Sequence, residues 1–163
     1  MFLFYESAAN VQCGFNRNMG HRGWISIAQF IKRSQRVTKF DCPRYDTIVH
    51  SDFPSVKLGM FSVLIPETAL APLSRALRSS TSLRCLHLDN CALSGRAMAL
   101  LCAGLRSNQS LQELYLCENR LTHADATHLR ALITLSQVLQ VLDIRNNNIQ
   151  VYSISILLKQ QGR

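Results

Sequence analysis

The apolar residues of this 163-residue chain follow one frame three times in its C-terminal half. The three stretches read SLRCLHLDNCALS, SLQELYLCENRLT and QVLQVLDIRNNNI. Counted from Leu83, Leu111 and Leu139, Leu or Ile fills positions one, four, six and eleven of each copy, and Cys or Asn fills position nine. The copies comprise Leu83, Leu86, Leu88, Cys91 and Leu93, then Leu111, Leu114, Leu116, Asn119 and Leu121, then Leu139, Leu142, Ile144, Asn147 and Ile149. Successive copies start 28 residues apart, so a chance alignment is a poor explanation.

Each copy predicts a short β-strand followed by a turn. Leu86 and Leu88 are two residues apart, and side chains alternate between the faces of a strand, so both are expected to face the core. The Asn or Cys at the ninth position is able to bond backbone groups that lie open where the strand ends.

The second half of each unit is expected to form a helix. The expected helix residues are Met98, Leu101, Ala103 and Leu105 in one unit and Ala126, Leu129, Ala131 and Ile133 in the next. Small side chains among them would let the helix pack close to the strand, and the units must stack because one alone cannot bury its apolar face. This is the leucine-rich-repeat signature. It predicts an α/β solenoid, a horseshoe segment with a parallel β-sheet on its concave face and helices on its convex face.

The frame also extends towards the N-terminus in two less regular units. The second unit has Val37, Phe40 and Cys42 at strand positions and a helix over 68–77. The first unit has Ala8, Val11, Cys13 and Asn16 in the frame and a helix from Trp24 to Lys32. We therefore expect a single domain over 1–163 with about five repeats, at 1–36, 37–82, 83–110, 111–138 and 139–163.

The second unit is interrupted, because Val37 and Leu83 are 46 residues apart rather than 28. The irregular insert covers about 46–64 and reads DTIVHSDFPSVKLGMFSVL. The insert has three possible interpretations. It is a functional loop, since insertions in solenoids map to loops, a shifted strand, or an error in the gene model. The shifted strand would use Leu58, Met60, Val63 and Ile65, which nearly fit the frame.

Strand residues that point away from the core are candidates for binding a protein, because solenoids use their concave surface in this way. Stacking the last three units gives the columns His87, Tyr115, Asp143, then Asp89, Cys117, Arg145, then Cys85, Glu113, Val141, with Asn90, Glu118, Asn146 at the edge. These twelve residues carry four carboxylates against one cation, Arg145. We therefore expect a protein-binding face that suits a somewhat basic partner and comprises His87, Asp89, Glu113, Tyr115, Cys117, Glu118, Asp143 and Arg145. Tyr115 and Arg145 are its expected anchors, since Tyr and Arg dominate binding hot spots.

The chain as a whole is basic, with a net charge of +8, but its cations are spread along the sequence. Arg78 and Arg106 are expected at helix C-termini, where a cation meets the negative end of the helix dipole. A nucleic-acid-binding protein needs a basic stripe, often with interleaved aromatic residues. No nucleic acid is therefore expected as a partner.

The sequence also bears on membranes and location. It contains no run of 18 apolar residues, so no membrane-spanning segment is expected. Its start, MFLFYESAAN, lacks the basic region and long apolar core of a secretory signal. The six cysteines include no CxxC pair. We expect reduced thiols and a cytoplasmic protein, with the nucleus as a second location.

No set of residues predicts catalysis, a cofactor or a metal site. His123 and His128 are five residues apart, so they do not share a helix face, and no third ligand is spaced for zinc. Cys117 lies beside Glu118, and a carboxylate disfavours the thiolate that a nucleophile needs. Cys91 and Cys102 are interpreted as a turn residue and a helix-core residue. The chain is therefore expected not to be an enzyme.

Three stretches carry a family resemblance: FYESAANVQCGFNRNMGHRGW (4–24), SRALRSSTSLRCLHLDNCALSGR (74–96) and LQELYLCENRL (111–121). They resemble the protein phosphatase 1 regulatory subunit 37 family of leucine-rich-repeat proteins, whose repeats are of the ribonuclease-inhibitor class. The resemblance extends over nearly the whole chain except about 46–64. It implies a non-enzymatic interaction module that binds and inhibits the protein phosphatase 1 catalytic subunit. The alternative is a general cytosolic leucine-rich-repeat scaffold for another protein, with no phosphatase role.

Two short stretches approach phosphatase docking patterns without matching them. RVTKF (36–40) separates Val37 and Phe40 by three residues, whereas an added strand needs its two anchors two residues apart to face the same side. We expect Val37 and Phe40 to lie in the core instead. SILLK (155–159) has one residue too many and is expected to form the last helix.

Overall fold

The computed structural model describes residues 10–12, 20–35, 39–41 and 64–149. Strands and helices alternate along the chain. The strands are β1 (Asn10–Gln12), β2 (Lys39–Asp41), β3 (Cys85–His87), β4 (Glu113–Tyr115) and β5 (Val141–Asp143). The helices are α1 (His21–Arg33), α2 (Glu67–Ser79), α3 (Gly95–Leu105) and α4 (Ala126–Leu135). The result is a two-layer α/β structure with a parallel sheet, which agrees with the predicted α/β class.

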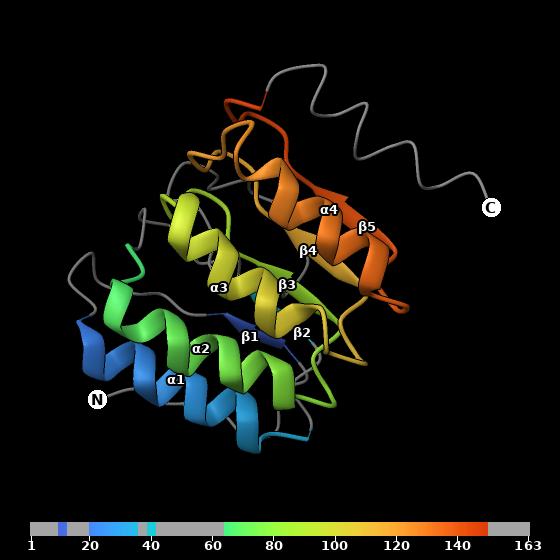
Figure 1. Ribbon diagram of the computed structural model, residues 1–163. Coiled ribbons are helices and arrows are strands. Elements are labelled where there is room, and N and C mark those ends of the chain that lie inside the picture. Colours follow the sequence, from blue (N-terminus) through green and yellow to red (C-terminus); the bar gives the residue numbers. More distant parts are fainter. Residues whose placement is uncertain (1–9, 13–19, 36–38, 42–63, 150–163) are drawn as a thin grey trace, which may run out of the picture.

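The strands form one parallel sheet in the order β1-β2-β3-β4-β5, and the four helices lie side by side over one of its faces (Figure 1). We call the side covered by α1–α4 the helical face and the opposite side of the sheet the sheet face. Sequential strands are neighbours and parallel, because each helix returns the chain to the end of the sheet at which the next strand begins. No helix of the described part is long and apolar enough to cross a membrane.

The pairing of β2 identifies the strand of the interrupted second unit. Phe40 lies opposite Val11 of β1 and Leu86 of β3, at the frame position predicted for it. Ile65, the last residue of the alternative shifted strand, precedes α2 and packs against the core. The other residues of that strand and nearly all of 46–64 lie outside the described residues, as do Ala8, Cys13, Asn16, Val37 and Cys42.

The predicted frame residues form the core between sheet and helices. Leu86, Leu88, Leu114 and Leu116 are each at most 1% exposed, and they meet helix residues such as Leu101 and Leu129 in one apolar cluster. The third copy is less buried: Leu139, Leu142, Ile144 and Ile149 only pack partly against this cluster. The physical reason is that β5 has a paired strand on one side only within the described part, and a stacked unit depends on its neighbours for burial.

The expected inward position of Ala103 is wrong, since its side chain is exposed. Residues three and four apart share a helix face, so Met98, Leu101, Cys102 and Leu105 face inwards while Ala103 does not. Gly104 is buried in its place, and it approaches α2 rather than a strand. The small residue of this helix therefore serves helix–helix packing, not the helix–strand packing that was expected.

Asn119, at the ninth position of the frame, bonds backbone groups of two neighbouring units. Its Oδ1 accepts from the N–H groups of Cys91 and Leu93, at 3.0 Å each. Its Nδ2 donates to the carbonyl oxygens of Leu88 (2.8 Å) and Leu116 (2.9 Å). Asn147 repeats the arrangement one unit later, accepting from Leu121 N–H and donating to the Leu116 carbonyl. The predicted role of this position is confirmed for both asparagines.

A second set of polar residues, which sequence reasoning missed, joins each of the helices α2, α3 and α4 to the strand that follows it. Ser80, Asn108 and Ser136 follow one another at 28-residue steps. Their side-chain oxygens accept from the N–H groups of Leu83, Leu111 and Leu139, the first residues of the next units. The buried Asn108 also donates to the carbonyl oxygens of Leu77 and Ser80. The repeat of a polar residue three positions before each copy was the signal that could have revealed them.

Candidate functional site

The sheet face carries the residues predicted to bind a protein. Strand pairing places Cys85, Glu113 and Val141 in one column and His87, Tyr115 and Asp143 in the next, as the frame predicts. Backbone bonds beyond the assigned strands, such as Asn90 N–H to the Cys117 carbonyl, continue the register to Asp89, Cys117 and Arg145. Because side chains alternate along a strand, these columns lie opposite the buried leucines.

An aromatic pair lies at the centre of the sheet face. The rings of His87 and Tyr115 stack with their centroids 4.1 Å apart and their planes 6° from parallel. The Tyr115 hydroxyl donates to a Glu113 carboxylate oxygen at 3.1 Å. Partial burial and the Glu113 carboxylate together raise the pKa of the Tyr115 hydroxyl. Tyr115 is therefore held between a ring on one strand and a carboxylate on its own strand, with its orientation fixed before any partner binds.

Asp89 connects the aromatic pair to the turn that follows the strands. One of its carboxylate oxygens accepts from the N–H of Cys117 at 2.6 Å. The other lies 3.5 Å from Nδ1 of His87. The carboxylate of Asp89 is thus positioned by the backbone that follows β4 and lies beside the stacked rings.

Arg145, one of the two expected anchors, is already engaged within the chain. Its guanidinium donates to both carboxylate oxygens of Asp143, with the shortest contact, Nη2 to Oδ2, at 2.6 Å. These bonds lower the pKa of the Asp143 carboxyl from 3.8 to about 2 and raise the pKa of Arg145. Arg145 therefore presents a guanidinium whose charge is largely balanced by Asp143.

Two other predicted positions contribute differently from what the frame suggests. Cys85 is only 8% exposed, so it adds little surface to its column. Glu118 has a left-handed backbone (φ 56°), as do Asn90 (φ 52°) and Asn146 (φ 56°) in the neighbouring units. The three edge residues therefore share a turn conformation that few L-residues other than Asn adopt readily.

Cys117 and Cys102 lack the surroundings of a nucleophile. Burial, a hydrogen bond to Asp143 and the charge of Asp89 raise the pKa of the Cys117 thiol to about 11. The acidic neighbours that act on it are these two residues rather than Glu118. Burial raises the pKa of Cys102 to about 12, which agrees with its predicted place in the helix core. Among the described residues, no group of three or more His, Cys, Asp or Glu is arranged to hold a metal ion.

The arrangement is suited to binding a basic protein surface. Asp89, Glu113 and Asp143 lie around the His87–Tyr115 pair, and Arg145 is the single cation among the predicted face residues of the last three units. Carboxylates and a stacked aromatic pair are both groups that attract Lys and Arg side chains. The sheet face therefore has the charge and the rigid aromatic surface of a recognition site.

Sequence comparison relates the chain to regulatory proteins. No protein-family model matches it. It is 34% identical over 149 residues to the protein phosphatase 1 regulatory subunit 37 homolog of Caenorhabditis elegans, which covers 91% of this chain and 14% of that protein. It is 34% identical over 151 residues to protein phosphatase 1 regulatory subunit 37 of Bos taurus, covering 91% of this chain and 19% of that protein. The predicted resemblance is confirmed, and the chain spans less than a fifth of the length of these relatives.

A wider comparison supports the repeat-like fold. The ribonuclease inhibitor of Sus scrofa is 34% identical over 94 residues, covering 57% of this chain and 21% of that protein. Among solved structures, actin-binding site 2 of leiomodin-1 superposes with a TM-score of 0.62 at 15% identity, covering 80% of this chain and 68% of that chain. The tropomodulin C-terminal domain from Caenorhabditis elegans gives a TM-score of 0.58 at 14% identity, with 82% and 72% covered. At such identities the two structures show a shared fold alone.

Proposed function

We propose that this chain, which is similar over nine tenths of its length to protein phosphatase 1 regulatory subunit 37, is a non-enzymatic module that binds and inhibits the catalytic subunit of protein phosphatase 1. In this proposal its strand–helix units form a leucine-rich-repeat solenoid of about five repeats, and the sheet face is the concave surface of a horseshoe segment. The location that goes with this role is the cytoplasm, with the nucleus as a second site.

The observation that supports the proposal most is the similarity to the bovine and nematode subunits along 91% of the chain. The sheet face adds a physical reason to expect protein binding. Its aromatic pair and carboxylates are pre-positioned by hydrogen bonds, so little side-chain entropy is lost on binding. A basic patch of the partner would meet Asp89 and Glu113 beside the ring of Tyr115.

Binding in this proposal does not pass through the RVTKF stretch. Lys39 and Phe40 lie in β2, between β1 and β3. Docking by strand addition needs free backbone N–H and C=O groups that can pair with the edge of a partner's sheet. The backbone of β2 is already paired on both sides, so these residues are not available. Val37 and the whole of SILLK lie outside the described residues.

The test compares variants of the sheet face in binding to the purified phosphatase 1 catalytic subunit. Tyr115→Ala is expected to weaken binding at least tenfold, because it removes the aromatic surface at the centre of the face. Arg130→Ala, at an exposed position of α4 on the helical face, is the matched control and should leave the affinity unchanged. Loss of binding in both variants, or a Tyr115→Ala chain that unfolds as readily as a core variant, would contradict the proposed site.

The second candidate is a scaffold for another protein, with no phosphatase role. It is favoured by the fact that Lys39 and Phe40, the two described residues of RVTKF, are already paired within β2. The same sheet face would then serve a different basic partner. A folded chain that shows no binding to the phosphatase 1 catalytic subunit at micromolar concentration would support this candidate over the first.

A further inference from the structure

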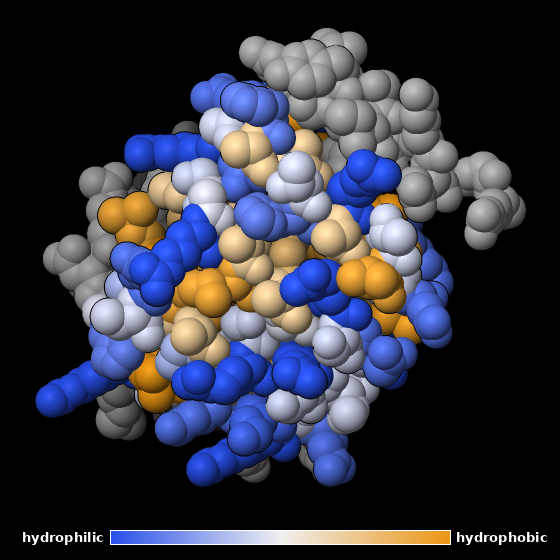
Figure 2. Space-filling view, in the orientation of Figure 1, coloured by the Kyte–Doolittle hydropathy of each residue, from blue (hydrophilic) through white to orange (hydrophobic). Residues whose placement is uncertain are grey.

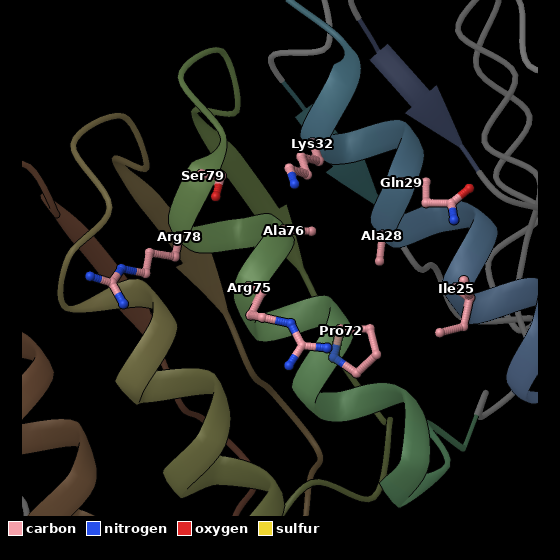
Figure 3. A pocket seen from close by; sticks show the side chains of 9 residues that line it. All are labelled: Ile25, Ala28, Gln29, Lys32, Pro72, Arg75, Ala76, Arg78 and Ser79. Atoms are coloured by element: carbon pink, nitrogen blue, oxygen red, sulfur yellow. The ribbon is translucent and has the colours of Figure 1, made fainter.

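A groove lies between α1 and α2 on the helical face, away from the sheet-face residues. Its volume is about 530 Å³, within the range of pockets that hold small ligands or side chains. Figure 3 shows its lining. Its apolar part includes Ala28 from α1 and Pro72 and Ala76 from α2, and its polar part includes Lys32, Arg75 and Arg78. The groove is thus apolar at its floor and cationic at its rim.

Two of the cations are placed to act on an occupant. In Figure 3 the Lys32 side chain extends from α1 towards α2, and that of Arg75 runs along α2 beside Pro72. Arg78 points away, over α3. No acidic side chain lines the groove among the described residues, and the nearby Glu67 is paired with Arg96 at 2.8 Å. Lys32 and Arg75 therefore carry charge that no ion pair within the described part balances.

Helix dipoles explain the positions of only some of these cations. Lys32 lies in the last turn of α1 and Arg78 in the last turn of α2, where a cation is stabilised by the helix terminus. Arg75 lies before the last turn of α2, so the dipole gives no reason for a cation there. Figure 2 shows strongly hydrophilic side chains over the α1–α2 region of this face, with smaller apolar areas among them. The groove therefore combines cations with small apolar residues, and the basic charge of the whole chain does not by itself explain this combination.

We propose that this groove binds a short acidic peptide segment of a partner protein. Carboxylates of the segment would pair with Lys32 and Arg75, and an apolar side chain between them would rest on Ala28 and Ala76. An inorganic anion would make no use of the apolar floor. The lining spans eight residues of each helix, Ile25 to Lys32 and Pro72 to Ser79, or about 12 Å at 1.5 Å per residue, which accommodates about four residues of an extended peptide.

This site is independent of the proposed phosphatase role. It lies on the opposite side of the sheet from Tyr115, and its charge has the opposite sign. The chain would therefore contact a basic surface through its sheet face and an acidic segment through its helical face. Such a chain could join two partners of opposite charge.

The experiment is a fluorescence polarisation titration of the full chain against a labelled peptide, Glu-Glu-Leu-Glu-Glu-Leu-Glu-Glu, at about 0.15 M salt, where exposed charges are screened beyond ~8 Å. We expect saturable binding that falls at least tenfold in Lys32→Glu/Arg75→Glu. The matched control, Arg120→Glu/Arg130→Glu, makes the same charge change at two exposed positions outside the groove and should alter the affinity less than twofold. Circular dichroism and thermal unfolding would verify that both variants fold.

A second peptide, in which Ser replaces both Leu residues, separates the groove from simple charge attraction. It should bind at least tenfold more weakly, because it has no apolar side chain for the floor. Equal losses in the two double variants would overturn the proposal, since they would mean general attraction to a basic chain. Equal affinity for the Ser peptide, or no saturable binding of the Leu peptide, would overturn it as well.

Discussion

Gly104 of α3 packs directly against Ser74 of α2. A β-carbon placed on Gly104 would fall 2.6 Å from the Ser74 hydroxyl oxygen and closer still to the Ser74 carbonyl oxygen. The Ser74 hydroxyl in turn donates to the carbonyl oxygen of Leu100, at 2.6 Å. The two helices are therefore joined by a side-chain-to-backbone hydrogen bond, at a point where neither helix has room for another atom. Backbone atoms of α2 cannot move aside as a flexible side chain would.

Gly104→Ala is expected to lower the free energy of unfolding by about 1–3 kcal/mol, the usual cost of overpacking. In most helix interiors the same exchange stabilises by about 0.5–1 kcal/mol, because Gly loses more conformational freedom on folding. The neighbouring exposed Ala103 provides the comparison, and Ala103→Gly should cost only that propensity difference. Urea unfolding of the two variants checks the prediction. A Gly104→Ala chain more stable than the wild type would mean that the helices are not in close contact.

Asn119→Ala is expected to destabilise the chain by about 2–4 kcal/mol, since it removes the acceptor of the buried Cys91 and Leu93 N–H groups and a donor to the Leu88 carbonyl. Asn148 is exposed and serves as the control, with a change within about 0.5 kcal/mol for Asn148→Ala. Denaturant unfolding monitored by circular dichroism measures both. Similar values for the two asparagines would show that the ninth position of the frame does not connect neighbouring units.

The Asp143–Arg145 pair predicts a pH dependence of stability. The folded-state pKa of Asp143, about 2, is below its ordinary value of 3.8, so the pair stabilises the chain above pH ~4. This contribution is lost as the pH falls from about 4 to about 2. In Arg145→Ala the carboxyl should titrate nearer its ordinary value, because the guanidinium that stabilises its charged form is gone. The Asp143 carboxyl carbon, followed by nuclear magnetic resonance, gives both pKa values directly, and equal values in the two chains would exclude the pairing in solution.

Cys117 is expected to react slowly with iodoacetamide at neutral pH. A thiol with a pKa of about 11 holds far less thiolate at pH 7.5 than a free cysteine, whose pKa is about 8.5. We expect its rate to be roughly 100-fold below that of a small thiol and to rise steadily up to about pH 11. Mass spectrometry of the peptide that contains Cys117 measures this rate separately from the other cysteines. Rapid labelling at pH 7 would instead indicate an activated thiol and reopen the question of catalysis.

The sequence frame predicted the strands and the core well, because both depend on local periodicity. The helix expected over Trp24 to Lys32 lies within α1, and the one expected over 68–77 lies within α2. The columns of the sheet face followed from the 28-residue period, since a constant step fixes the register of parallel strands. Leu86 and Leu114 are therefore neighbours in the structure for the same reason that they align in the sequence.

Side-chain contacts were harder to predict than the strands and the core. The closeness of Gly104 to Ser74 depends on the angle and spacing of two helices, and a single-unit frame contains neither. The pairing of Arg145 with Asp143 depends on side-chain conformers, so an anchor predicted from residue type proved to be engaged. Asn108 could have been found, because its polar counterparts Ser80 and Ser136 occur at the same step. The groove between α1 and α2 had no signal in the frame, since its residues come from two units.

The most direct test of the proposed phosphatase role is a titration of the purified chain into the phosphatase 1 catalytic subunit, with binding and activity read in the same samples. We predict saturable binding with a parallel loss of phosphatase activity, and a weaker response with the Tyr115→Ala chain. A folded wild-type chain that neither binds nor slows the enzyme at micromolar concentration would contradict the proposal.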